Sequence, residues 1–560
     1  MLEIVTSLLE GSRGFLPTLL PLSFTISFLL AIIFFALDYS EIKKYFKIRL
    51  SVWVILIFIF LLALSLRLIT PVYLTTYGDE FAHVQVARDI ITSGRAVFNE
   101  PVGFSYVVAL FLLFGGINEN SAYMVNIVTG SLLVVVVFLF CFLLFKSEKT
   151  GLYSAFIVSI IPLYILLSRN IEPDTVSAFF ILLTFTAFLL FFKIRDLKIG
   201  IFATSILAFS ISIKQEDILL IPLVLLLSVL FLDAKTLKSA IKNKRLWFLV
   251  LLLTILVIPH ILHLSLEIYP ALYGKSTATV VEGKLIRMEN IPMNAQVLAK
   301  AMNGSFYPLL INVFLFAGLL YGFKKHRKEA LFLAIFFSCY MFAYLAYSAS
   351  IVEKYLITGL VPLLCFAGLG FYAFEEFALS MPHKIARQKV ITKIVPTFFV
   401  LLLFLLSIPY FYAVQNDPRP LNVNHGYPRG EIEYKEMEVI DMIDREIDSC
   451  YVVTKEPVFF SATDLKAIPT ESVLKQPEML QDVTGNRGCV FYFKDLYCTD
   501  FYSLGNRCGI ENESFETCEE LRRKIVSQCR EMHEKFELQP YLEYEFGDFN
   551  LTLYKITTSS

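Results

Sequence analysis

The sequence predicts an α-helical polytopic membrane protein with about twelve transmembrane helices, followed by a C-terminal α/β domain on the extracytoplasmic side. Three observations lead to this fold class. Hydrophobic residues make up 56% of the 560 positions, charged residues make up only 18%, and the mean hydropathy is +0.64. Apolar segments recur along residues 1–414, with basic residues in every second connection between them. Residues 415–560 instead alternate between strand-like and helix-like runs.

The apolar segments have the length that a bilayer requires, because a hydrocarbon core about 30 Å thick needs about 20 apolar residues per helix. The first segment, 14–37, is too long for a cleavable signal peptide and lacks its basic flank, so we interpret it as an anchor. We expect the other helices at 50–70, 122–145, 152–169, 174–193, 199–213, 217–232, 246–266, 306–323, 330–349, 355–378 and 394–414.

The basic residues predict the orientation, since lysine and arginine near helix ends favour the cytoplasmic side. They occupy the connections near Lys43, Lys146, Lys193, Lys235, Lys324 and Lys384. The intervening connections then face outward, as does everything after residue 415; these connections are 71–121, 170–173, 214–216, 267–305 and 350–354. The net charge of −1 gives no indication of a nucleic-acid partner.

The predicted outer domain, 415–560, is rich in cysteine. It contains six of the nine cysteines, namely Cys450, Cys489, Cys498, Cys508, Cys518 and Cys529. An even number of cysteines in an oxidising compartment is typical of disulfides, so up to three bridges are possible; reduced core thiols are the alternative. Strand-like runs at 450–453, 489–493 and 541–554, with helix-like runs at 434–447 and 516–536, indicate a small α/β domain.

The densest polar sequence on the predicted outer side is Thr76-Tyr-Gly-Asp79-Glu80-Phe-Ala-His83, in the first large loop. If the chain is helical from Asp79 onward, Glu80 and His83 share a face and Asp79 heads the helix, where the macrodipole favours a negative charge. Asp79 is then either a simple helix cap or a reactive carboxylate. The apolar stretch 104–114 is too short to span and indicates a helix lying along the outer leaflet.

The order of these motifs resembles the GT-C superfamily of glycosyltransferases, and in particular the branch with protein O-mannosyltransferases and lipid A aminoarabinose transferases. The motifs are Asp79-Glu80, Ala87-Arg88, Gly94, a Pro-x-Gly segment, Gly115 and a span that begins near Asn126. The resemblance implies an inverting transfer of a sugar from a polyprenyl phosphate to a glycan, lipid or protein acceptor on the outer face of the cell membrane. A lipid-sugar flippase or secondary transporter is the alternative function.

By this resemblance Asp79 is the base that deprotonates the acceptor hydroxyl, and Glu80 orients Asp79 or the acceptor. The second outer loop, Arg169-Asn170-Ile-Glu172-Pro-Asp174, matches the acidic second loop of the family. Glu172 and Asp174 could hold a divalent cation, Mg²⁺ or Mn²⁺, together with Asp79. The alternative is that Asp174 caps the following helix.

A leaving phosphate must be met by cations or backbone donors. The candidates on the predicted outer side are Lys354, Lys214, Arg169 and Arg88. Lys354 stands in Lys-Tyr-Leu, where the family commonly has Arg-Tyr-Leu. Each cation could instead be an anchor that reaches to the lipid headgroups.

Overall fold

The chain divides into two compact units, which we describe separately. The helical unit comprises Met1–Tyr73, Thr92–Val107 and Tyr123–Asn424, and the sheet unit comprises Leu74–Ile91, Val108–Ala122 and His425–Ser560. The computed structural model describes residues 14–69, 77–96, 101–265, 288–302, 307–346, 353–380, 388–416, 429–447, 450–455, 457–480, 489–498, 515–546 and 549–557.

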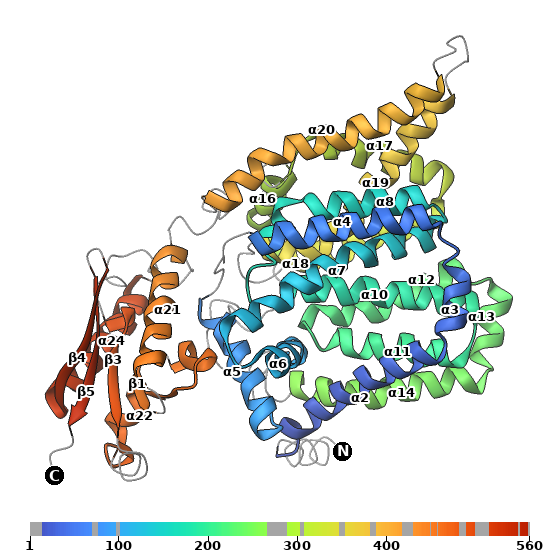
Figure 1. Cartoon of the computed structure of the whole chain (residues 1–560). Coiled ribbons are helices and arrows are strands. Elements are labelled where there is room, and N and C mark those ends of the chain that lie inside the picture. Colours follow the sequence, from blue (N-terminus) through green and yellow to red (C-terminus); the bar gives the residue numbers. More distant parts are fainter. Residues whose placement is uncertain are drawn as a thin grey trace. The chain divides into compact units, whose positions relative to one another are not determined.

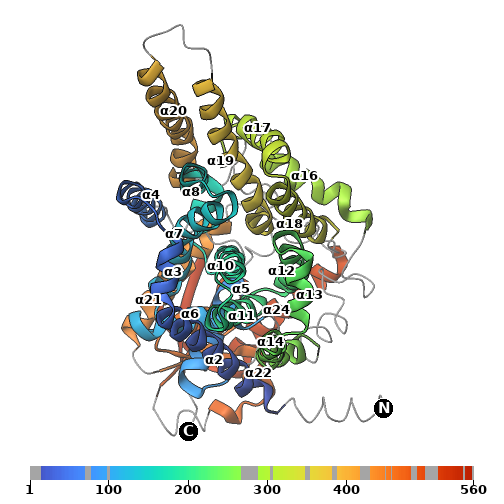
Figure 2. The ribbon, with the colours of Figure 1, turned by 90° about the vertical axis from the view of Figure 1, so that its right-hand side faces the viewer.

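The helical unit contains a helix in every apolar segment that the sequence analysis identified (Figure 1). Its elements are α2 (Leu16–Leu37), α3 (Tyr39–Tyr45), α4 (Leu50–Ile69), α7 (Glu119–Phe145), α8 (Glu148–Ile160), α9 (Pro162–Leu166), α10 (Pro173–Ile194), α11 (Leu197–Ile211), η1 (Gln215–Leu219), α12 (Leu220–Phe231), α13 (Ala234–Ile241), α14 (Lys244–His263), η4 (Met288–Asn290), α16 (Ile291–Met302), α17 (Leu310–Lys325), α18 (Arg327–Leu345), η5 (Glu353–Tyr355), α19 (Leu356–Ser380) and α20 (Gln388–Asn416). Helix α10 packs against α11, α12 and α19, and it lies near the centre of the end-on view in Figure 2.

Within the described residues, seven helices are long and apolar enough to cross a membrane: α2, α4, α7, α10, α14, α18 and α19. Helices such as α4 expose large apolar side chains, with Leu50 79% and Phe58 69% exposed. An apolar surface of this kind suits a lipid environment. Shorter apolar helices include α6 (Gly103–Gly115), α11 and residues 397–411. The count of about twelve spans stays a prediction.

One predicted segment, 152–169, is not a single helix. It is divided into α8 and α9 at Ile161, whose backbone is extended with φ −69° and ψ 118°. Pro162 follows directly, and a residue before proline is pushed out of the helical region by the proline ring. The proline therefore ends α8 and begins α9.

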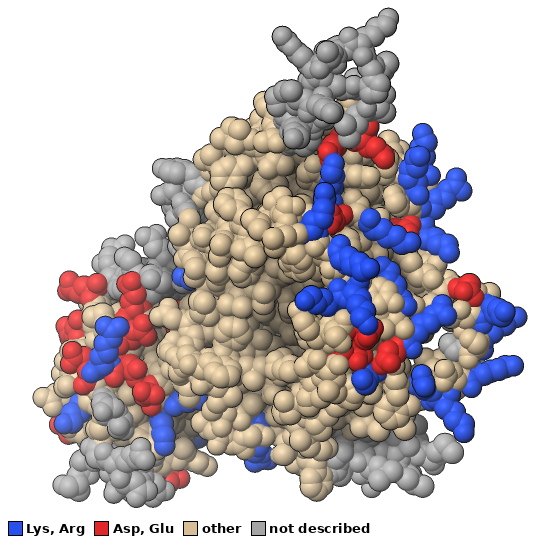
Figure 3. All heavy atoms as spheres, turned by 45° about the vertical axis from the view of Figure 1, so that its right-hand side comes forward, with Lys and Arg blue, Asp and Glu red and all other residues tan. Residues whose placement is uncertain are grey.

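The basic connections lie on one side of the helical unit. In Figure 3 lysine and arginine side chains gather on the side that carries α3 and α13 in Figure 1. Lys43 and Lys44 stand in the last turn of α3, Lys238 in that of α13, and Lys324 and Lys325 in that of α17. These three basic connections, which are predicted to share a membrane face, thus share an end of the bundle; the connection around Lys384 lies outside the described residues.

Helices α17 and α19 approach each other closely through two glycines. A Cβ on Gly318 would lie 1.8 Å from the carbonyl oxygen of Phe366, and a Cβ on Gly370 would lie 1.8 Å from that of Phe314. The rings of Phe314 and Phe371 stack with their centroids 3.6 Å apart. Small residues that admit close backbone contact are the usual basis of helix association in membranes.

The sheet unit contains a five-stranded mixed sheet in the order β2-β1-β3-β5-β4. Strand β1 is parallel to β2 and β3, whereas β5 is antiparallel to β3 and β4. The elements are α5 (Tyr77–Ser93), α21 (Arg429–Glu446), β1 (Tyr451–Thr454), η7 (Pro457–Ala462), β2 (Lys466–Pro469), α22 (Thr470–Lys475), β3 (Val490–Lys494), η8 (Leu496–Cys498), α24 (Phe515–Lys535), β4 (Glu537–Phe546) and β5 (Phe549–Thr557). Helix α6 is divided between the units.

The sheet corrects two sequence predictions. Strand β2 was not predicted, because only Ala467 and Ile468 of its four residues are apolar. The single strand-like run at 541–554 is instead two strands, with Phe546 paired to Phe549. Both strands share alternating apolar residues, and Gly547-Asp548 between them is a turn signal that separates such strands.

Two disulfides connect the tail, one between Cys450 and Cys489 and one between Cys498 and Cys529. The predicted use of tail cysteines in disulfides is confirmed for these four. Cys508 and the side chain of Cys518 lie outside the described residues. Cys141, Cys339 and Cys365, in the helices, are free thiols.

We expect Gly370→Ala to destabilise the α17–α19 pair, because the added Cβ would meet a backbone carbonyl that cannot move without displacing its helix. The expected loss is about 1–3 kcal/mol, the range for overpacked cores, measured as a lower thermal unfolding midpoint in detergent. Gly359→Ala is the matched control, since its Cβ would meet only the flexible end of Met341. Equal midpoints for the two variants would contradict this reading of the interface.

Candidate functional site

Two buried ion pairs lie at the ends of helices in the helical unit. Lys354 Nζ lies 2.8 Å from Glu172 Oε1, and Lys214 Nζ lies 2.7 Å from Asp174 Oδ1. No side chain of the four is more than 10% exposed. The sequence analysis named all four residues but gave the lysines and the carboxylates separate roles. The structure brings them together as two pairs.

Both carboxylates stand at the start of α10. Glu172 is the N-cap residue and Asp174 lies in the first turn, so Asp174 is not the cap that the sequence alternative proposed. A negative charge is favourable at a helix N-terminus. Asn126 of α7 donates hydrogen bonds to the carbonyl oxygens of Asn170 and Glu172, each at 2.8 Å. The predicted second outer loop is therefore fixed by a neighbouring helix.

The two lysines face one tyrosine ring. The centroid of the Tyr355 ring is 4.5 Å from Lys214 Nζ and 5.7 Å from Lys354 Nζ, and the Tyr344 ring is 5.2 Å from Lys214 Nζ. A ring face attracts an ammonium group within about 6 Å. The shared ring makes the two ion pairs a single cluster, which we call the lysine cluster.

The lysines remain charged although they are buried. Burial alone lowers the pKa of Lys214, but the carboxylates of Asp174 and Glu216 outweigh it and raise that pKa well above its usual value. Burial likewise lowers the pKa of Lys354, and Glu172 more than reverses the effect. Both ammonium groups are therefore charged at neutral pH, and each is paired with a carboxylate.

Two further carboxylates beside the cluster, Glu216 and Asp217, were not recognised from the sequence. Asp217 is fully buried and accepts hydrogen bonds from Ser177 Oγ, at 2.9 Å to each carboxylate oxygen, and from Tyr340 at 3.4 Å. It follows Glu216, which lies 3.8 Å from Lys214 Nζ. The signal was visible in the acidic pair Glu216-Asp217, which begins two residues after Lys214 in a short break between apolar segments.

Arg67 is a second residue that sequence reasoning missed. It is fully buried near the end of α4, where Nε donates to Ser168 Oγ at 3.1 Å and Nη1 to the carbonyl oxygen of Ala63 at 3.0 Å. Its Nη2 group has no hydrogen-bond partner among the described residues. An ionisable residue inside an apolar segment is itself a signal of a functional or structural site.

Arg169, a predicted phosphate ligand, is half-buried in the loop before α10. Its guanidinium carbon lies 5.9 Å from the centroid of the Tyr123 ring. Arg169 and the lysine cluster share the helical unit. Its role at a phosphate stays a prediction.

The predicted metal set has different partners in this structure. Glu172 and Asp174 each pair with a lysine, which neutralises the charge that a divalent cation would need. Across the described part of the chain, no three His, Cys, Asp or Glu side chains gather around a possible metal position. The side chain of Asp79, the third predicted ligand, lies outside the described residues. The metal set therefore stays a prediction, and the proposed reaction does not depend on a metal.

The acidic motif of the first predicted outer loop lies in α5, which confirms the helix expected from Asp79 onward. Asp79 stands in its first turn. Glu80 is fully buried and His83 is 1% exposed, on the shared face that their spacing predicted. Arg88, further along α5, donates to the carbonyl oxygen of Thr463 at 2.9 Å.

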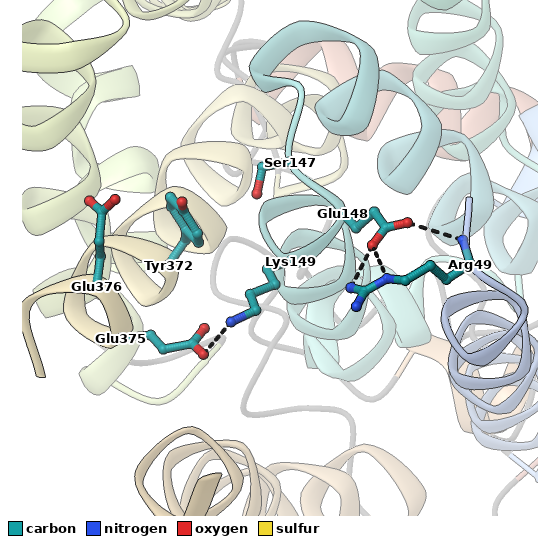
Figure 4. Close-up of a pocket in the computed structure, with 7 residues that line it drawn as sticks. All are labelled: Arg49, Ser147, Glu148, Lys149, Tyr372, Glu375 and Glu376. Atoms are coloured by element: carbon teal, nitrogen blue, oxygen red, sulfur yellow. Dashed lines mark hydrogen bonds and ion pairs between the residues drawn. The ribbon is translucent and has the colours of Figure 1, made fainter. Parts of the chain in front are cut away.

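A polar pocket of about 360 Å³ lies at the other end of the helical unit. It is lined by Arg49, Ser147, Glu148, Lys149, Tyr372, Glu375 and Glu376. Figure 4 shows its two cations paired, Lys149 with Glu375 and Arg49 with Glu148. Lys354 lies in η5, just before α19 begins, and Glu375 lies near the other end of α19, which at the rise of an α-helix is about 30 Å away. The pocket therefore lies about one membrane thickness from the lysine cluster.

Comparison with known proteins gives a family match and similarities to solved structures. The family model described as dolichyl-phosphate-mannose-protein mannosyltransferase matches residues 99–263. The fold is similar to that of ArnT from Cupriavidus metallidurans bound to undecaprenyl phosphate, with a TM-score of 0.58 and 11% identity over 91% of this chain and 99% of that chain. No curated protein sequence matches the chain significantly.

The fold is also similar to that of the archaeal oligosaccharyltransferase AglB from Archaeoglobus fulgidus, in complex with an inhibitory peptide and a dolichol-phosphate. The TM-score is 0.50 with 11% identity, over 91% of this chain and 74% of that chain. The family match and these folds confirm the resemblance to the GT-C superfamily. The chain is a multi-pass helical membrane protein with a C-terminal sheet domain, as predicted.

We expect Lys354→Met to destabilise the protein by about 3–5 kcal/mol, because it leaves the Glu172 carboxylate buried without its counter-charge. The double variant Lys354→Met/Glu172→Gln should recover most of this loss, since it removes both charges. Thermal unfolding in detergent measures both effects. A single variant as stable as the wild type would show that Glu172 has another adequate partner.

Proposed function

We propose that this protein is an inverting glycosyltransferase that moves a sugar from a polyprenyl phosphate to an acceptor on the outer face of the membrane. The observation that carries the proposal is the lysine cluster, two charged and buried ammonium groups within a fold similar to that of a protein bound to undecaprenyl phosphate. The family match over residues 99–263 supports a sugar carried on a lipid phosphate.

In this proposal Lys354 and Lys214 bind the donor phosphate. A phosphate oxygen accepts strong hydrogen bonds from ammonium groups, and a buried site strengthens the attraction. Glu172 and Asp174 keep the lysines charged and in place before the donor arrives, and the phosphate then takes over part of that counter-charge. Arg169 is a candidate for a further contact to the same phosphate.

Asp79 acts as the base. Its carboxylate takes the proton of the acceptor hydroxyl while the acceptor oxygen forms a bond to the anomeric carbon. The bond from that carbon to the phosphate oxygen breaks, and its electron pair leaves with the polyprenyl phosphate. Attack opposite the leaving group inverts the configuration. Glu80 is fully buried, so we assign it to orienting the turn that holds Asp79 and not to direct contact with the acceptor.

We expect Asp79→Asn to lower sugar transfer by at least about 100-fold, the low end of the effect of general base catalysis. The assay follows radiolabel from a polyprenyl-phosphate sugar into acceptor in membranes that contain the chain. Asp89→Asn is the matched control, because Asp89 is exposed on the same helix and has no proposed role. Wild-type sugar transfer by Asp79→Asn would show that Asp79 is not the base. Transport of the lipid-linked sugar across vesicles without transfer would favour the flippase.

The outward orientation of α5 is also part of the proposal and can be tested by itself. We expect a cysteine at the exposed position 89, Asp89→Cys, to react with a membrane-impermeant maleimide in intact cells. A cysteine at position 44, Lys44→Cys in the basic helix α3, should react only after permeabilisation. The chain without either cysteine gives the background. The reverse labelling pattern would place α5 on the cytoplasmic side and would contradict the proposed reaction.

A further inference from the structure

Helix α5, which carries Asp79 and Glu80, forms one compact unit with the C-terminal residues, although more than 300 residues separate them in sequence. Leu74–Ile91 groups with His425–Ser560. The turn that holds the proposed base is therefore assembled against the soluble part of the chain.

Two side chains bind backbone carbonyl oxygens in opposite directions. Ser461 Oγ donates to the carbonyl oxygen of Phe81 at 3.0 Å, and Arg88 Nη1 donates to the carbonyl oxygen of Thr463 at 2.9 Å. The rings of Phe81 and Phe459 meet edge to face with centroids 5.9 Å apart. Phe81 is the residue directly after Glu80, so the Ser461 contact acts on the acidic turn itself.

The segment that makes these contacts is firmly connected to the sheet. Helix η7 and the residues after it join β1 to β2, which pair in parallel. Thr463 Oγ1 donates to the carbonyl oxygen of Phe460 at 2.8 Å, and the amide of Asp464 donates to Asp444 Oδ1 of α21 at 3.1 Å. The Phe460 ring also packs edge to face on Phe493 of β3, at 5.9 Å. Movement of this segment would disturb its contacts with α21 and β3 and the connection between β1 and β2.

The contact region is buried on both sides. Phe81 is fully buried, and Phe459 and Phe460 are each 1% exposed. Ser461 and Thr463 are 5% and 2% exposed. Water therefore cannot replace the two hydrogen bonds easily, and losing a donor leaves a buried carbonyl less satisfied. Such contacts determine the orientation of α5 more strongly than exposed ones would.

We infer that the C-terminal domain positions the acidic turn of α5 for the proposed transfer, with Ser461 and Arg88 as positioning residues. The inference rests on the proposed function. It gives Arg88 a role different from the phosphate binding that the sequence suggested. A base must lie within hydrogen-bond reach of the proton that it removes, so a small displacement of the turn reduces the rate and leaves donor binding unchanged.

The test compares Ser461→Ala and Arg88→Met with matched controls that lie away from the contact, Ser472→Ala in α22 and Arg95→Met after α5. We expect each positioning variant to lower kcat for transfer about 10-fold or more, with the KM for the polyprenyl-phosphate sugar unchanged. Arg88→Lys, which keeps a donor, should recover part of the rate. The controls should match the wild type. Hydrogen exchange of the α5 amides should accelerate in Ser461→Ala.

Each other result counts against the inference. Wild-type kcat in Ser461→Ala and Arg88→Met, in a protein that Asp79→Asn inactivates, would overturn it and leave the proposed function intact. A raised KM for the polyprenyl-phosphate sugar in Arg88→Met would instead indicate that Arg88 binds the donor phosphate, as the sequence suggested. Full transfer by Asp79→Asn would end the role of Asp79 as base, whereas unchanged hydrogen exchange in Ser461→Ala would separately overturn the positioning contact.

Discussion

The lysine cluster depends on one constraint: a charge buried beside apolar helices needs a counter-charge in contact with it. Lys354 and Lys214 meet this requirement through Glu172 and Asp174, which are in turn favoured by the N-terminus of α10. Removing one member of a pair takes away a buried counter-charge of the other, which is costly. In the proposed reaction the donor phosphate supplies a new counter-charge to the lysines. We therefore expect the ion pairs to keep the site folded before the donor of the proposed reaction arrives.

The sequence was sufficient for the helices and for the residues of the lysine cluster, but not for the pairing between them. Apolar length and periodicity are local properties, so each segment could be located from its own composition. The contact of Lys354 with Glu172 joins residues 182 positions apart and depends on how helices pack. Asp217 was missed because its sequence context is that of an ordinary loop acid, and its hydrogen bonds with Ser177 and Tyr340 form only when the helices pack together. Strand β2, with only two apolar residues, had no local signal.

The two ends of the helical unit handle charge differently. At the polar pocket Arg49 is 68% exposed and Lys149 is 46% exposed, so their pairs with Glu148 and Glu375 are screened by water and weak. At the other end the lysines are at most 10% exposed, so water and salt screen their ion pairs much less. Burial, more than residue type, thus distinguishes the proposed phosphate site from a set of surface charges.

The base and the cations of the proposed reaction are fixed by different parts of the chain. The lysines are held by helix ends within the helical unit, whereas the turn of Asp79 is held by Ser461 and its neighbours in the C-terminal domain. Donor binding and proton abstraction can then vary separately, because a change in the tail alters the position of the base and leaves the ion pairs intact.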